Sequence, residues 1–172
     1  MARKIFAKNL AKKIISSFLT LKAPIKIEEI LKEYKIRVME NDFPEDSKID
    51  ALLIRKGGNG FIVLNKNKPK RRQRFSLAHE LGHYLMHAND ELYLDKNITE
   101  TFIFTRTADK KDDNELEANY FAAELLMPSN LIERDFPIYY IQDPENFIST
   151  MAEDYEVSEP ALTYKLKELS LI

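Results

Sequence analysis

The segment RFSLAHELGHYL, residues 74–85, predicts a buried helix that also carries reactive side chains. We expect the helix to span residues 71–87, because apolar side chains recur through it at helical spacing, at Phe75, Leu77, Ala78, Leu81 and Leu85. His79 and His83 are four residues apart, which places them about 40° apart around the helix and one turn apart along it. Both imidazoles can therefore reach a single ion.

Glu80 lies about 100° from His79 on the same helix. It is too far round to be a third ligand, but it is close enough to hydrogen-bond a water held on the metal, which is the position of a general base. His-Glu-x-x-His on a helix is a known signature of zinc metalloproteases. The alternative is an ordinary pair of histidines packed in the core or lying on the surface. A catalytic zinc needs three protein ligands and an open position, so a third ligand must come from elsewhere.

The same helix does not supply that ligand. A metzincin site would require glycine at position 86 and histidine at position 89, where this chain has Met86 and Asn89. His87 lies about two turns from His79, too far for three histidines on one straight helix to share an ion. We therefore expect His87 to be a packing or rim residue.

A second amphipathic helix is predicted over residues 114–127, with its apolar stripe ending before Pro128 and formed by Ala118, Phe121, Ala122, Leu125 and Leu126. Its three glutamates differ in direction. Glu115 falls about 50° from the centre of the stripe, whereas Glu117 and Glu124 fall more than about 100° away. A carboxylate beside an apolar stripe is costly unless it is paired or binds a metal. Glu115 is thus the predicted third ligand, and the other two glutamates are predicted to be solvated.

Asn119 follows Glu115 by one turn. From there its amide can orient a ligating histidine by a hydrogen bond without binding the metal itself. The chain contains no cysteine, so the ligands must be nitrogen and oxygen atoms. Zn²⁺ is the expected ion, although two imidazoles and one carboxylate also accept Mn²⁺, Fe²⁺ or Co²⁺. We predict no cofactor beyond the metal.

The remaining sequence predicts a mainly helical α+β domain over residues 1–172, with a small antiparallel sheet packed beside the His-Glu-x-x-His helix. Two helices are expected over residues 1–34, the first with a stripe at Ile5, Leu10, Ile14, Ile15 and Phe18. Residues 35–65 predict a strand followed by a hairpin around the Gly-rich residues 57–60. The side chains of residues 101–107 follow an alternating pattern, which predicts a strand or an ordered loop. Residues 144–172 predict a helical tail, with helix starts near Pro144 and Glu159.

Charge and composition limit the partners. The net charge is −2, no window is long and apolar enough to cross a membrane, and cysteine is absent, so we expect a soluble, cytoplasmic protein. Lys and Arg gather in residues 1–35 and 66–74, as solvated faces or as a rim for an acidic partner or DNA. Residues 144–172 hold six acids against two lysines, which disfavours DNA binding by the tail. Direct nucleic-acid binding is therefore not expected.

Residues 74–85 and the segment ELEANYFAAELLMP, residues 115–128, resemble the two signatures of the ImmA/IrrE family of metallopeptidases. The resemblance implies that His79, His83 and Glu115 bind zinc and that Glu80 is the base. Asn114-Glu115 with Asn119 is also similar to the Asn-Glu-x-x-x-Asp pattern of thermolysin-like enzymes, with an amide in place of the last carboxylate. The tail resembles the helix-turn-helix-like end of family members.

Family members typically cleave a helix-turn-helix repressor encoded by a mobile element or a stress regulon, and the resemblance implies a protein substrate of this kind. The alternative is a non-catalytic protein, braced by its metal, that acts by sequestering its partner. The residue that would stabilise the oxyanion of the reaction is not assigned. The candidates are Tyr84, His87, Tyr120 and the arginines that precede the helix.

Overall fold

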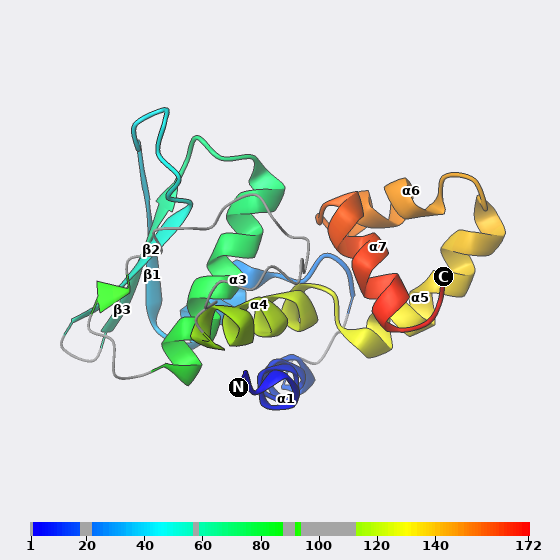
Figure 1. The fold of residues 1–172 in the computed structure, drawn as a ribbon, viewed down its shortest axis with the longest axis horizontal. Coiled ribbons are helices and arrows are strands. Elements are labelled where there is room, and N and C mark those ends of the chain that lie inside the picture. The colour runs from blue at the N-terminus through cyan, green and yellow to red at the C-terminus, as the bar shows by residue number, and fades with distance from the viewer. Residues whose placement is uncertain (1, 18–21, 57–58, 88–91, 94–112) are drawn as a thin grey trace.

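The computed structural model describes residues 2–17, 22–56, 59–87, 92–93 and 113–172. Helices dominate this part of the chain and a small sheet lies at one side (Figure 1), so the predicted α+β fold class is confirmed. In chain order the elements are α1 (Lys4–Ser16), α2 (Ile27–Glu33), β1 (Ile36–Asn41), β2 (Ala51–Lys56), β3 (Asn59–Asn65), α3 (Lys70–Met86), β4 (Leu92–Tyr93), α4 (Asp113–Leu126), α5 (Ser129–Gln142), α6 (Phe147–Asp154) and α7 (Glu159–Glu168).

The sheet has the strand order β1-β3-β2-β4. The predicted hairpin is present, because β2 and β3 pair antiparallel from Ala51 opposite Leu64 to Lys56 opposite Asn59. β1 instead pairs in parallel with β3, so the sheet is mixed and not wholly antiparallel as the sequence predicted. The connection between β1 and β2 is too long for a tight turn and carries the chain past β3. Asn65 fixes the end of this connection by donating to the carbonyls of Ile49 and, through its backbone, Asp50.

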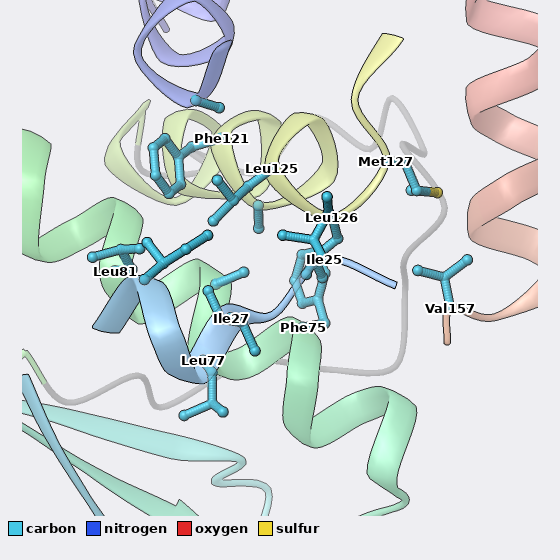
Figure 2. Close-up of a cluster of buried hydrophobic side chains, with 14 of the residues drawn as sticks. Ile25, Ile27, Phe75, Leu77, Leu81, Phe121, Leu125, Leu126, Met127 and Val157 are labelled. Carbon is cyan, nitrogen blue, oxygen red and sulfur yellow. The ribbon is translucent and has the colours of Figure 1, made fainter. Parts of the chain in front are cut away.

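Helix α3 lies between the sheet and α4, and contacts β2 and β3 on one side. Leu81 of α3 and Leu125 of α4 belong to the same buried apolar cluster (Figure 2). Gly82 lets these helices approach closely, since a Cβ there would lie 3.0 Å from Cδ1 of Phe121 and 3.3 Å from Cα of Ala118. This close approach fixes the position of one helix relative to the other.

Helix α1 packs on α4 through a face that differs from the predicted stripe. Its buried residues are Ala7, Ala11, Ile14 and Ile15, whereas Ile5 is 76% exposed. The two alanines occupy the same face as the isoleucines and let α1 lie close to α4, so small side chains replace the larger one expected. Phe18 lies outside the described residues.

Three helices, α5, α6 and α7, lie together at the end of the molecule away from the sheet (Figure 1). The start of α7 is as predicted, because Oγ of Ser158 accepts a hydrogen bond from the backbone N–H of Ala161. α6 begins at Phe147, three residues after Pro144. The sequence did not predict α5, which contains Pro137. Pro128 ends α4 and directly precedes α5, so one proline separates two helices.

Residues 101–107 lie outside the described part of the chain, and their predicted strand or loop stays a prediction. Within the described ranges, the helices lack the combination of length and apolarity that crossing a membrane requires.

Candidate metal centre

The structure brings together the side chains of His79, His83 and Glu115. The Nε2 atoms of the two histidines are 2.9 Å apart. Oε2 of Glu115 lies 3.2 Å from Nε2 of His79, and Oε1 lies 3.2 Å from Nε2 of His83. One donor atom from each residue lies within 4.8 Å of the others. These are the residues that the sequence predicted as ligands.

The packing of α3 against α4 explains why the three donors meet. The histidines lie on consecutive turns of α3. Gly82 lies between them and contacts Ala118 and Phe121 of α4. Glu115 lies in the first turn of α4, where the partial positive charge of the helix end favours a carboxylate. The histidines are buried, while 29% of the Glu115 side chain is exposed. The cluster thus opens to solvent on the glutamate side.

Asn119 contacts the outer nitrogen of His79, with 3.1 Å between Oδ1 of the amide and Nδ1 of the ring. A carbonyl oxygen only accepts, so Nδ1 of His79 carries the proton and Nε2 presents its lone pair. This lone pair faces the carboxylate of Glu115. Lone pairs at such distances repel one another unless a cation lies among them. A metal ion held by these donor atoms would fit this arrangement.

The charge states suit a cation as well. Burial is the main cause that lowers the pKa of His83, to about 4, so its imidazole is neutral at neutral pH. Burial acts to raise the pKa of Glu115, but the contacts with His79 and His83 outweigh it and hold that pKa well below its usual range. Neutral imidazole and ionised carboxylate are the forms that bind metals.

Glu117 and Glu124 are buried, and the prediction that they are solvated is wrong. Glu117 accepts hydrogen bonds from the backbone N, Nε and Nη2 of Arg3, at 2.8, 3.0 and 2.8 Å. These bonds are the main reason that the pKa of Glu117 is lowered to about 2. Glu124 accepts from Nζ of Lys165 at 2.6 Å and from Oγ of Ser129 at 2.9 Å. Helix α4 is covered on more than its apolar stripe, and partners distant in sequence stabilise the buried carboxylates.

His87 does not join the donor atoms, although it is buried beside them. Its Nδ1 lies 3.0 Å from Nδ1 of His83, and its Nε2 lies 3.2 Å from Oε2 of Glu117. The sequence predicted a packing or rim residue, and it gave no sign of these contacts. A side chain four residues after a ligand on the same helix was the available signal.

Glu80, the predicted general base, is fully buried on α3 next to His79.

Arg55 contacts the C-terminal end of α3. Nη2 of Arg55 donates to the carbonyls of His83, Tyr84 and His87 at 2.8, 2.8 and 3.2 Å, which stabilises the negative end of the helix.

Several cations of residues 66–74 are engaged within the fold. Arg72 pairs with Asp50 at 2.6 Å, and Arg74 bonds the carbonyl of Ile25 at 2.8 Å and Glu156 at 3.0 Å. This stretch therefore helps to hold α3 in position. The aromatic candidates for stabilising the oxyanion also have cation partners: Arg55 lies over the ring of Tyr84 and Lys4 over that of Tyr120.

The model of the IrrE N-terminal-like domain, which describes a family of peptidases, matches residues 31–167. The chain belongs to this family. The matched region contains all of the donors described above, and the resemblance to ImmA/IrrE metallopeptidases is thereby confirmed.

The chain is similar in sequence to two proteins from Bacillus and a Bacillus phage. It is 26% identical to metallopeptidase ImmA of Bacillus subtilis (strain 168) over 143 residues, which are 83% of this chain and 76% of the relative. It is 34% identical to an uncharacterized immunity region protein 2 of Bacillus phage phi105 over 76 residues, 44% of this chain and 43% of that protein.

A solved structure with the same fold is that of a Mycobacterium tuberculosis transcriptional regulator, with a TM-score of 0.60 and 14% identity. The match covers 94% of this chain but 46% of the regulator, so the chain spans about half of that longer protein. At this level of identity the likeness establishes the fold.

Proposed function

We propose that this metallopeptidase is a zinc-dependent endopeptidase that inactivates one specific protein, a helix-turn-helix repressor of a mobile element or stress regulon. The observation that carries the proposal is the convergence of Nε2 of His79, Nε2 of His83 and the Glu115 carboxylate at one point. Glu80 follows the first ligand on the same helix.

The donor set supports zinc. Two imidazole nitrogens and one carboxylate make three protein ligands, the number that catalytic zinc sites use to leave one position open. Mn²⁺, Fe²⁺ and Co²⁺ accept the same donors and are the alternatives to test. A bound metal of this kind supplies a Lewis acid that polarises the scissile carbonyl and makes a water nucleophilic near neutral pH.

The residues of the chain supply the rest of the reaction. Glu80 takes a proton from the attacking water and delivers it to the nitrogen of the leaving amine. Asn119 holds the His79 ring in the tautomer that binds the metal. The exposed side of Glu115 is the side from which an extended peptide reaches the donors.

The relatives support the substrate class. One is named metallopeptidase ImmA and another is named for an immunity region of a phage, which is a mobile element. A chain without cysteine suits a reducing compartment, so we propose that the cleavage takes place in the cytoplasm.

The test is the Glu80→Gln variant, co-expressed with the repressor encoded beside its gene. We expect the wild type to cut the repressor and the variant to leave it intact, because the amide cannot accept the proton. The zinc content and the thermal unfolding of the variant should equal those of the wild type. Glu133→Gln, an exposed glutamate of α5, is the matched control and should cut normally. Normal cleavage by the Glu80 variant would refute the mechanism. Relief of repression without cleavage would instead favour the sequestering protein.

A further inference from the structure

We infer that His87 and Glu117 are positioning residues that, with Arg3, hold the imidazole of His83 in the tautomer and orientation that present Nε2 to the metal. The inference rests on the proposed function, because it takes His83 as a metal ligand. His87 and Glu117 are not among the three residues whose donor atoms converge, so both act through His83.

The four residues form a continuous chain of hydrogen-bonding contacts. Nδ1 of His83 lies 3.0 Å from Nδ1 of His87. Nε2 of His87 lies 3.2 Å from Oε2 of Glu117, and the same oxygen accepts from Nη2 of Arg3 at 2.8 Å. This series of contacts runs from the C-terminal end of α3, through Glu117 of α4, to Arg3, the residue that precedes α1.

The chemistry of the last member sets the direction of every bond. Arg3 directs three donors at Glu117, which is therefore an ionised carboxylate and only accepts. Nε2 of His87 must then donate. We take His87 as the neutral ring, which has one donor and one acceptor, so its Nδ1 accepts and Nδ1 of His83 donates. Nε2 of His83 is left with a lone pair, and it faces Glu115 at 3.2 Å.

The arrangement matches the one around the other histidine. Nδ1 of His79 donates to Asn119, and Nδ1 of His83 donates to His87. Helix α4 thus supplies a ligand at Glu115 and the anchors of both histidines, one directly at Asn119 and one through His87 at Glu117. A partner on the outer nitrogen fixes the tautomer of a ligating histidine and raises its basicity.

A purely structural role for this buried group predicts a loss of stability alone, so the test must read the tautomer and the metal. The chain has three histidines, at positions 79, 83 and 87, and the ¹H–¹⁵N correlation spectrum of ¹⁵N-histidine-labelled, zinc-loaded protein contains only these rings. We expect the ring proton on Nδ1 in His79 and His83 and on Nε2 in His87. A proton on Nδ1 of His87 or on Nε2 of His83 would overturn the inference.

Variants of His87 separate the two bonds. His87→Asn keeps an acceptor near the position of Nδ1, whereas His87→Phe keeps the ring shape and removes both bonds. We expect the zinc Kd, measured by competition with a chelator, to rise about 10–100-fold in His87→Phe and less in His87→Asn. A zinc Kd in His87→Phe equal to that of the wild type would contradict the inference.

Glu124→Gln is the matched control, because Glu124 is an equally buried, ion-paired carboxylate of α4 at its other end. It should lower stability and leave both the His83 tautomer and the zinc Kd unchanged; an equal loss of zinc affinity would assign His87 a structural role. Should His87→Phe not fold, Glu117→Gln replaces it. A mixed His87 tautomer and weaker zinc binding are then expected, because an amide can also donate to Nε2 of His87, and an unchanged zinc Kd would refute the inference. A wild type that binds no zinc would refute the proposed function, whereas a wild type that binds zinc but carries a proton on Nδ1 of His87 would refute this inference alone.

Discussion

Asn119 shows how much one side chain settles in the metal centre. Its Oδ1 atom, 3.1 Å from Nδ1 of His79, selects the ring nitrogen that faces His83 and Glu115. An amide is a weaker acceptor than a carboxylate, so it stabilises the protonated Nδ1 less strongly. In the proposed site, the residue at this position therefore tunes how strongly His79 would hold a metal.

Replacing Asn119 by leucine should raise the zinc Kd about 10–100-fold, because the ring of His79 loses the partner that fixes its tautomer. Replacing it by aspartate should keep or tighten zinc binding, since a carboxylate accepts the same hydrogen bond more strongly. Competition with a chelator measures both. Asn9→Leu, at an exposed site of α1, is the control. An unchanged Kd in Asn119→Leu would show that the contact does not support the metal.

At this scale the sequence predicted the positions that depend on local spacing. The closeness of His79 and His83 follows from one turn of one helix, and the inward direction of Glu115 follows from its angle to an apolar stripe. The burial of Glu117 and Glu124 depends on Arg3 and Lys165, which are 114 and 41 residues away, and no local pattern contains that information. The contact of His87 with Glu117 was missed for the same reason, whereas its contact with His83 is local and follows from their four-residue spacing.

Among the elements, the contact of α3 with α4 is the one that assembles the donors. It is made where Gly82, between the two histidines, meets Phe121 and Ala118. A side chain at this position would crowd Phe121 and Ala118, so atoms of α4 would have to shift by a few tenths of an ångström.

Gly82→Ala should destabilise the protein by about 1–3 kcal/mol, because the added methyl group overpacks the contact. The zinc Kd should rise as well, since Glu115 and Asn119 move with α4. Urea unfolding and zinc competition measure the two effects. Adding Phe121→Leu should recover part of the loss, because Cδ1 of Phe121 is the nearest atom, and Phe121→Leu alone is the control. Full stability with wild-type zinc affinity in Gly82→Ala would contradict this account.

The sequence predicted those elements whose periodicity is complete within one segment. The helices over residues 71–87 and 114–127 agree with α3 and α4 to within one residue at each end, and the Gly-rich hairpin agrees with β2 and β3. The parallel pairing of β1 was not predictable in this way, because it depends on where a nine-residue connection carries the chain. Helix α5 was missed because Pro137 interrupts its pattern.

For the whole molecule, buried charge joins the C-terminal helices to the helix that carries Glu115. Lys165 of α7 is 1% exposed, and its Nζ lies 2.6 Å from Oε2 of Glu124 and 3.0 Å from Oγ of Ser129. Glu168 adds a link from α7 to Lys8 of α1 at 2.6 Å. These ion pairs tie α1, α4 and α7 together.

Lys165→Met should destabilise the protein by about 3–5 kcal/mol, because it leaves the buried carboxylate of Glu124 without its close partner. The double variant Lys165→Met with Glu124→Gln should recover part of this loss, since the uncompensated charge is gone. The free energy of unfolding in urea measures both. Lys167→Met, an exposed lysine two residues away, should change stability by less than about 0.5 kcal/mol. Equal effects at positions 165 and 167 would refute the argument.

The link through Glu168 also predicts a dependence on pH. Burial acts to raise the pKa of Glu168, but Lys8 and Lys4 outweigh it and lower the pKa from 4.5 to about 2. Between these values the unfolded chain binds more protons than the folded one, so the stability from this group is present above pH 4.5 and falls as the pH drops toward 2. Urea unfolding of the wild type and of Glu168→Gln should converge across this window, and a constant difference would exclude the effect.

The confinement of every histidine to one buried cluster gives the protein a built-in chemical reporter. A reagent that acylates imidazoles also reacts with exposed lysines, but it should spare the three buried histidine rings until α3 and α4 separate. The masses of the histidine-containing peptides, followed over time in the reagent, would then record how often this contact opens. Protection by added zinc would show directly how firmly the ion locks the two helices together.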